Sequence, residues 1–232
     1  MAVESWPRQG LASGEQTPTR RGISIPVAGR GGVVPYITSW SGEHALATHL
    51  VMRGNGIGYA DETLLDRDEH GVLWVRTPSR QAHGRPEFRK VHPLRQRRAM
   101  RRLLCQVCGQ PADRDGQGVL WLLRDHREDW PGWPDGIANT FPPVCLSCAW
   151  LSVRMCPALR RGYVSVRARR FPLTGVYGVQ YRPAHPKPES VGHVVVGYDD
   201  PAIRWTRAAQ QVRSLHDCTI VPLSPAEPWE GK

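Results

Sequence analysis

Two C-x-x-C pairs, Cys105 to Cys108 and Cys145 to Cys148, constrain this chain more than any other feature. Two such turns bring four thiolates together, which is the full ligand set of one tetrahedral Zn²⁺ ion. Residues 109–144 lie between the pairs and must fold as an insert. We therefore predict a structural zinc site held by Cys105, Cys108, Cys145 and Cys148. A redox dithiol or a disulfide is the alternative, although a redox motif needs only one pair.

The expected cellular compartment rests on the paired cysteines, on the lack of a secretory leader and on the lack of a membrane-spanning apolar run. The first residues carry no basic and apolar leader of the secretory type, and no apolar run reaches the roughly 20 residues that span a bilayer. We expect a chain in the reducing cytoplasm with no membrane partner, where paired cysteines favour metal over a disulfide.

The chain is long and apolar enough to fold around its own core, with 232 residues of which 40% are hydrophobic. We expect an α+β protein with small β-rich segments around a central treble-clef or zinc-ribbon module. The sequence divides into a mobile tail (1–21), an N-terminal α+β segment (22–92), a basic helix with the four-cysteine zinc module (93–160), a C-terminal β-rich segment with one helix (161–222) and a second tail (223–232).

Positive charge is concentrated in two stretches that flank the cysteines. Residues 76–102 hold ten basic residues and one acid, and residues 154–170 hold six arginines and no acid. The whole chain has a net charge of +10, so the rest of it is net negative. A basic surface beside a zinc module is typical of proteins that bind nucleic acid, and we expect DNA rather than RNA. The alternative is that the arginines cover helix faces and pair with the acidic cluster at residues 61–69.

Arginines suited to phosphate contact are predicted on one helix and one strand. Pro93 fits the first position of a helix, and the basic run after it leads into the first cysteine pair. Helical spacing would place several of these arginines along a phosphate backbone, although a solvated helix anchored by its leucines fits equally well. The predicted nucleic-acid contacts are Arg95, Arg98, Arg101 and Arg102 on the helix, and Arg167 and Arg169 on the later strand.

The remaining patterns predict short strands and further helices. A serine, an apolar stripe and a closing glycine predict a helix at residues 43–53, and alternation predicts a strand at 71–76. Strands at 163–170 and 175–181 would form a hairpin with a basic surface. A proline-rich linker (182–190), a strand (192–198), a helix (201–214) and a last strand (218–222) follow.

The insert between the cysteine pairs carries a buried strand and an aromatic turn. Residues 119–123 form an apolar run, and the turn that contains Trp130 and Trp133 is expected to pack on a small core. The second cysteine pair then begins a helix at residues 146–156. A knuckle, a hairpin and a knuckle at the start of a helix is treble-clef organisation. A protein-interaction module that presents the two tryptophans to a partner is a further hypothesis.

The same segment resembles the HNH endonucleases that carry an added four-cysteine zinc. Asp125 and His126 after a strand, Asn139 six residues before the second cysteine pair, and that pair itself carry the resemblance. It implies that His126 is the general base, that Asp125 ligates a catalytic Mg²⁺ and that Asn139 orients the loop. The family's final histidine has no counterpart here, and one histidine with one carboxylate can hardly hold a divalent ion. A divergent nuclease therefore stays an alternative to a binding protein.

The run from Arg97 to Gly109 is also similar to a group of actinobacterial double-CxxC zinc proteins, a resemblance that implies no activity. The function that the sequence favours is a zinc protein that binds nucleic acid in a regulatory or accessory role.

Overall fold

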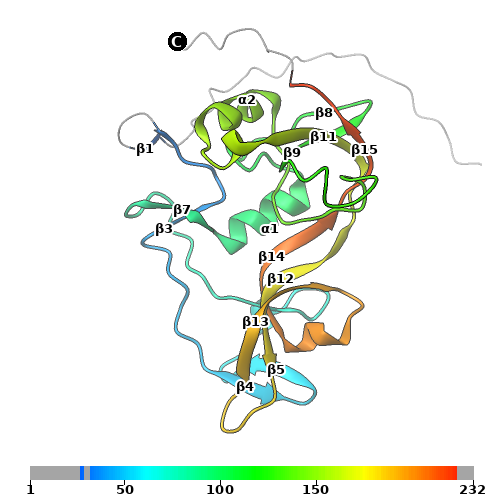
Figure 1. The fold of residues 1–232 in the computed structure, drawn as a ribbon. Helices are drawn as coiled ribbons and strands as arrows, with labels where there is room; N and C mark the ends of the chain where they lie inside the picture. The colour runs from blue at the N-terminus through cyan, green and yellow to red at the C-terminus, as the bar shows by residue number, and fades with distance from the viewer. Residues whose placement is uncertain (1–26, 29–31, 224–232) are drawn as a thin grey trace, which may run out of the picture.

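The computed structural model describes residues 27–28 and 32–223, which form a mixed α+β structure with two α-helices and several small sheets (Figure 1). The predicted α+β class is confirmed. The α-helices of this part of the chain are α1 (Pro93–Arg102) and α2 (Leu146–Met155), and the short 3₁₀ helices are η1 (Leu64–Asp66), η2 (Leu159–Arg161) and η3 (Pro201–Trp205).

The strands of the described chain are short at the N-terminal end and longer after α2. They are β1 (Val27–Ala28), β2 (Gly32–Val33), β3 (Thr38–Trp40), β4 (Leu50–Arg53), β5 (Gly56–Tyr59), β6 (Leu73–Trp74), β7 (Pro86–Val91), β8 (Arg114–Asp115), β9 (Gly118–Arg124), β10 (Ala138–Asn139), β11 (Tyr163–Arg170), β12 (Leu173–Arg182), β13 (Glu189–Gly197), β14 (Thr206–Ser214) and β15 (His216–Ile220).

A four-stranded antiparallel sheet, in the order β15-β11-β9-β8, lies beside the cysteine pairs. The predicted buried strand is confirmed as β9, which is buried at every position except its last. Because alternate residues of a strand face opposite sides, β9 supplies two cores. Trp121 packs with Met100 of α1 and with Trp133, while Leu120 and Leu122 pack around the cysteines.

A five-stranded sheet follows the order β10-β14-β12-β13, and β6 pairs in parallel with β14. Its strands come from three of the predicted segments: β6 from the N-terminal one, β10 from the zinc module and the others from the C-terminal one. Strand pairing therefore crosses the predicted segment boundaries.

The predicted basic helix is confirmed as α1, which contacts both larger sheets. Pro93 stands at its first position and His92 is its N-cap, whose side chain accepts a hydrogen bond from the backbone N–H of Arg95. Met100 is fully buried in the core of the four-stranded sheet, and Gln96 binds the backbone of β14. The helix therefore fixes the two sheets against each other.

The predicted helix at residues 43–53 is wrong. Glu43 is buried, and its carboxylate accepts hydrogen bonds from the backbone N–H groups of Trp40 and Arg80, at 2.9 and 2.8 Å. Residues 50–53 form β4, which pairs with β5 across a turn at Gly54, where φ is 55°. Gly54, which was expected to end a helix, instead lies in the turn of a hairpin. The hydrogen bonds of Glu43 to distant backbone groups outweigh the local helical pattern.

The predicted helix at residues 201–214 is also wrong. Only residues 201–205 are helical, as the 3₁₀ helix η3, and the rest form β14. Asp200 is the N-cap, as expected, and accepts from the N–H of Ala202 at 2.8 Å. The strand has a hydrogen-bonded neighbour on both edges, and such central pairing outweighs local propensity.

The predicted hairpin of residues 163–170 with 175–181 does not form. The first strand, β11, pairs with β9 and β15, whereas β12 pairs with β13 and β14 in the other sheet. The predicted linker at 182–190 is instead the connection of the β12–β13 hairpin, in which Arg182 faces Glu189. In the aromatic turn, Trp133 is buried in the core, while Trp130 stays 39% exposed.

Candidate metal centre and basic surface

The first cysteine pair lies in a tight turn directly after α1. Leu103 ends the helix in the left-handed region, with φ 51°, and turns the chain toward Cys105. The backbone N–H of Cys105 donates to the carbonyl of Gln110 at 2.7 Å, and the N–H of Val107 lies 3.4 Å from the Cys105 sulfur. The N–H of Gly109 closes the turn on the Cys105 carbonyl at 2.9 Å. This compact turn holds Cys105 and Cys108 on one side.

The second cysteine pair lies at the start of α2. Cys145 is the N-cap of the helix, and Cys148 lies in its first turn, as the sequence predicts for a helix that opens at this pair. The two turns are joined directly, because the N–H of Gln106 donates to the carbonyl of Pro143 at 2.9 Å. The backbone therefore sets the positions of both pairs relative to each other.

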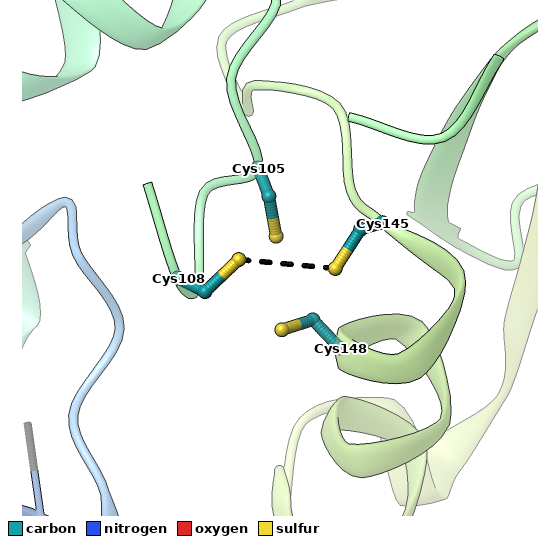
Figure 2. A group of neighbouring side chains, drawn as sticks. All are labelled: Cys105, Cys108, Cys145 and Cys148. Carbon is teal, nitrogen blue, oxygen red and sulfur yellow. Dashed lines mark hydrogen bonds between the residues drawn. The ribbon is translucent and has the colours of Figure 1, made fainter. Parts of the chain in front are cut away.

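The four sulfurs point toward one common centre (Figure 2). All four lie within 4.8 Å of one another, and the sulfurs of Cys108 and Cys145 are 3.8 Å apart. A tetrahedral zinc ion with Zn–S bonds of about 2.3 Å separates its sulfurs by about 3.8 Å. All four cysteines are free thiols. The group could therefore hold a metal ion such as zinc.

The electrostatics of the four thiols favour a cation. Hydrogen bonding among the neighbouring sulfurs, more than burial, raises the pKa of Cys105 and of Cys148. The same hydrogen bonding lowers the pKa of Cys145, against the effect of burial. The four neighbouring thiols therefore differ in how readily they ionise, and thiolates this close to one another repel. A divalent ion at the centre removes that repulsion, and its binding displaces the remaining protons.

Each of the three residues of the HNH resemblance is engaged by a partner outside that set. Asp125 pairs with Arg127 at 2.6 Å, and His126 lies 3.5 Å from the carboxylate of Asp129. Asn139 is buried in β10, and its side-chain amide is closed on the backbone of Phe141 by two hydrogen bonds of 2.8 and 3.0 Å. Among the described residues, the four cysteines are the only group of three or more metal-binding side chains.

Two of the arginines predicted to contact nucleic acid are buried, which corrects their assignment. Arg95 is 5% exposed and binds both carboxylate oxygens of Glu43 at 2.6 and 2.7 Å. Arg167 is 9% exposed and pairs with Asp113 at 2.5 Å and Asp115 at 2.9 Å. Burying a guanidinium costs free energy unless it is paired, so both side chains stay with their carboxylates.

The other four predicted arginines are exposed, and three of them line a basic groove. Arg98, Arg101 and Arg102 lie on the outer face of α1, and Arg169 is exposed near the end of β11. A groove of about 330 Å³ on α1 is lined by Leu94, Arg97, Arg98, Arg101 and Arg102. We call this the α1 groove.

The charges of the α1 groove are only partly neutralised. Arg101 pairs with Glu69 at 2.6 Å, whereas Arg98 and Arg102 have no side-chain hydrogen bond or ion pair in the part of the chain that the structure describes. Arg97 lies over the ring of Trp74, 3.9 Å from the ring centroid, a contact that no local sequence pattern indicates. The groove therefore keeps an excess of positive charge.

The acidic cluster at residues 61–69 does pair with arginines, as the alternative for the basic stretches proposed. Arg76 binds Asp61 at 2.9 Å and Asp66 at 2.7 Å, and Arg67 binds Glu62 at 2.8 Å. With the pair between Arg101 and Glu69, this accounts for part of the basic charge but leaves Arg98 and Arg102 outside it.

No protein-family model, curated protein or solved structure matches this chain. The two resemblances noted from the sequence therefore gain no support, and the metal site rests on the four clustered cysteines. None of the described helices is long and apolar enough to cross a bilayer.

Proposed function

We propose that the chain is a cytoplasmic zinc protein that binds nucleic acid, with the zinc ion in a structural role. Four thiolates complete a tetrahedral shell and leave no open position for water or substrate, which is the mark of a structural zinc site. Cys105 and Cys148 are also buried, which suits an ion that stabilises the fold.

The proposed arrangement of the zinc site is that of a treble clef. A turn with the first cysteine pair is followed by the β8–β9 hairpin, and the second pair begins α2. The apolar residues around the cysteines, Leu120, Leu122 and Val144, form one buried cluster with them. Zinc would tie the end of α1, the hairpin and α2 into one unit.

The feature that most favours nucleic acid is the α1 groove. It brings four guanidinium groups together on one helix that ends directly before Cys105, so the zinc site would fix the end of the helix that carries them. Arginine contacts phosphate through paired N–H donors, and a row of such contacts follows a phosphate backbone. Arg98 and Arg102 lie one helical turn apart and have no ion pair with any described residue, so they are the central contacts in this proposal.

The other two functions have less support. A nuclease needs its metal-binding residues together, and Asp125, His126 and Asn139 each bind other partners. The interaction-module hypothesis relied on two tryptophans, of which Trp133 belongs to the core.

The test is a fluorescence anisotropy titration of the zinc-loaded protein with a labelled DNA duplex, in about 50 mM and about 200 mM salt, with and without Mg²⁺. We expect affinity to fall steeply with salt while the duplex stays intact. Arg98→Ala/Arg102→Ala should lower affinity about tenfold and flatten the salt dependence. The control Arg182→Ala/Lys187→Ala removes the same charge from the β12–β13 hairpin and should leave the affinity within about twofold. No binding at low salt would overturn the proposal.

A further inference from the structure

A second basic surface lies beyond the C-terminal end of α2, at the end of the molecule where α2, β9 and β11 lie together (Figure 1). It consists of one exposed aromatic ring and four exposed arginines, and we call it the Tyr163 surface. Its members are Arg124, Arg154, Arg160, Arg161 and Tyr163.

Strand pairing and one hydrogen bond from a side chain to a backbone carbonyl bring these residues together. Tyr163 begins β11 and lies opposite Arg124, the last residue of β9. The guanidinium of Arg160 donates to the carbonyl of Arg154 at 3.4 Å, which holds η2 against the end of α2. Arg160 and Arg161 are separated from Tyr163 only by Gly162. Tyr163 therefore has Arg124 opposite it on the neighbouring strand, and Arg160 and Arg161 in the turn that precedes it.

The charge of the Tyr163 surface is not neutralised within the described chain. None of its four arginines forms an ion pair with a carboxylate there, in contrast to Arg76, Arg95 and Arg167. Asp125 follows Arg124 directly, but its carboxylate is held by Arg127 at 2.6 Å, which also keeps its pKa below the usual range. Arg124, Arg154 and Arg161 are therefore available to an outside anion, while Arg160 donates one N–H to the Arg154 carbonyl.

The exposed ring of Tyr163 indicates which kind of anion this surface would bind. Tyr163 is 37% exposed at the start of its strand, whereas the next residues of β11 are buried. An aromatic ring beside arginines is the arrangement with which proteins stack an unpaired base while binding the adjoining phosphates. Bases inside a duplex are already stacked on one another and cannot use such a ring without being unstacked.

The Tyr163 surface is held in place by the buried core around the cysteines. Leu159 of η2 and Val153 of α2 pack against the buried cluster that contains Cys105 and Cys148. Pairing of β11 with β9 holds the backbone of Tyr163. A stacking residue that is already positioned loses little conformational entropy on binding, which favours affinity.

We propose that the Tyr163 surface binds single-stranded nucleic acid, with a base stacked on the Tyr163 ring and the flanking phosphates on its arginines. This inference rests on the proposed function and specifies its substrate: the chain engages an unpaired strand at this surface, in addition to phosphates at the α1 groove.

The test compares a labelled oligo-dT strand of about 12 nucleotides with a duplex of the same length, using the zinc-loaded full chain. Tyr163→Ala should weaken binding of the single strand about tenfold and leave duplex binding within about twofold. Tyr163→Phe keeps the ring and should bind the single strand like the wild type. Trp130→Ala is the matched control, because Trp130 is similarly exposed but follows Glu128 and Asp129, and it should change neither affinity.

The outcomes separate this inference from the proposed function. Unchanged single-strand binding by Tyr163→Ala, or an equal loss for both probes, would overturn the single-strand assignment. If Arg98→Ala/Arg102→Ala still weakens duplex binding in that case, the proposed function stands. Absence of salt-sensitive binding to either probe would overturn both, and binding of an acidic peptide in preference to oligo-dT would place a protein partner at this surface.

Discussion

The side chain of Gln96 in α1 binds the backbone of Gln211 in β14 at both ends of its amide. Its nitrogen donates to the Gln211 carbonyl at 2.9 Å, and its oxygen accepts from the Gln211 N–H at 2.9 Å. Along the same edge of β14, β10 pairs with residues 213 and 214 and β6 with residues 207 and 208. The Gln96 amide fills the gap between these two strands, so the basic helix is bonded into the sheet.

Replacing Gln96 with alanine should lower the free energy of unfolding by about 2 to 3 kcal/mol. The change leaves the N–H and carbonyl of Gln211 without their partner in a buried place, and it also removes a 2.7 Å bond to the carbonyl of Thr140. Chemical denaturation of the zinc-loaded protein measures the effect. Gln81→Ala, at an exposed position, is the control and should be neutral. A loss below about 0.5 kcal/mol would show that the sheet does not depend on this contact.

Replacing Cys148 with serine should weaken zinc binding at least about 100-fold, because a hydroxyl is a poor substitute for a thiolate ligand. Cys156→Ser is the matched control, since Cys156 lies just beyond α2 and outside the four-cysteine group. Competition against a chromogenic chelator measures both affinities. Equal affinities for the two variants would remove Cys148 from the ligand set.

Acid should destabilise the protein partly through Glu43. Burial raises the pKa of this carboxyl, but the hydrogen bonds from Arg95 and from the Trp40 N–H outweigh burial and lower the pKa from 4.5 to about 2. A depressed carboxyl pKa stabilises the fold above the unfolded value, and that contribution is lost as pH falls toward the folded value. The pair therefore contributes on the order of 3 kcal/mol at neutral pH, which declines below about pH 4.5.

Denaturation of the wild type and of Glu43→Gln at several pH values between 6 and 3 tests this pH dependence. The difference in stability between them should shrink as pH falls. Zinc loss in acid affects both proteins and cancels in the difference. Burial also lowers the pKa of His92, whose ring lies 3.6 Å from this carboxylate. Both proteins therefore also lose folding stability through His92 below about pH 6.5. A difference that stays constant with pH would contradict the assignment.

Replacing His126 with alanine should change neither nucleic-acid affinity nor stability by a measurable amount. The side chain of His126 is 43% exposed, and its one described ion pair, with Asp129, is a surface contact. Incubation of a labelled duplex with Mg²⁺ and either protein, followed by gel electrophoresis, tests the role directly. Cleavage by the wild type that the variant lacks would instead establish the nuclease alternative.

The sequence predicted those elements whose signal is local. The spacing of the cysteines, the position of Pro93 before a basic run and the apolar run of β9 each depend on neighbours within a few residues, and each corresponds to the structure. The start of α2 at Cys145 belongs to the same group.

The parts that could not be predicted depend on partners far away in the chain. Arg95 appeared to be a surface arginine because its carboxylate, on Glu43, precedes it by 52 positions. Arg167 is buried for the same reason, against Asp113. The region of β14 carried a helical pattern, and only its place between two neighbouring strands makes it a strand. The spacing of arginines along a helix or strand predicts which of them share a face. Ion pairs with carboxylates far away in the sequence then determine which of those arginines are buried.

Zinc content and thiol reactivity, measured on one preparation of the full chain under reducing conditions, show whether the four cysteines hold a zinc ion. We expect one zinc ion per chain and four cysteines protected from alkylation until a chelator is added, with Cys156, which lies outside the four-cysteine group, modified first. Burial and Asp135 raise the pKa of Cys218 to about 12, so this thiol should react slowly. A metal-free chain that folds with all of its thiols equally reactive would show that the four cysteines are not a zinc site.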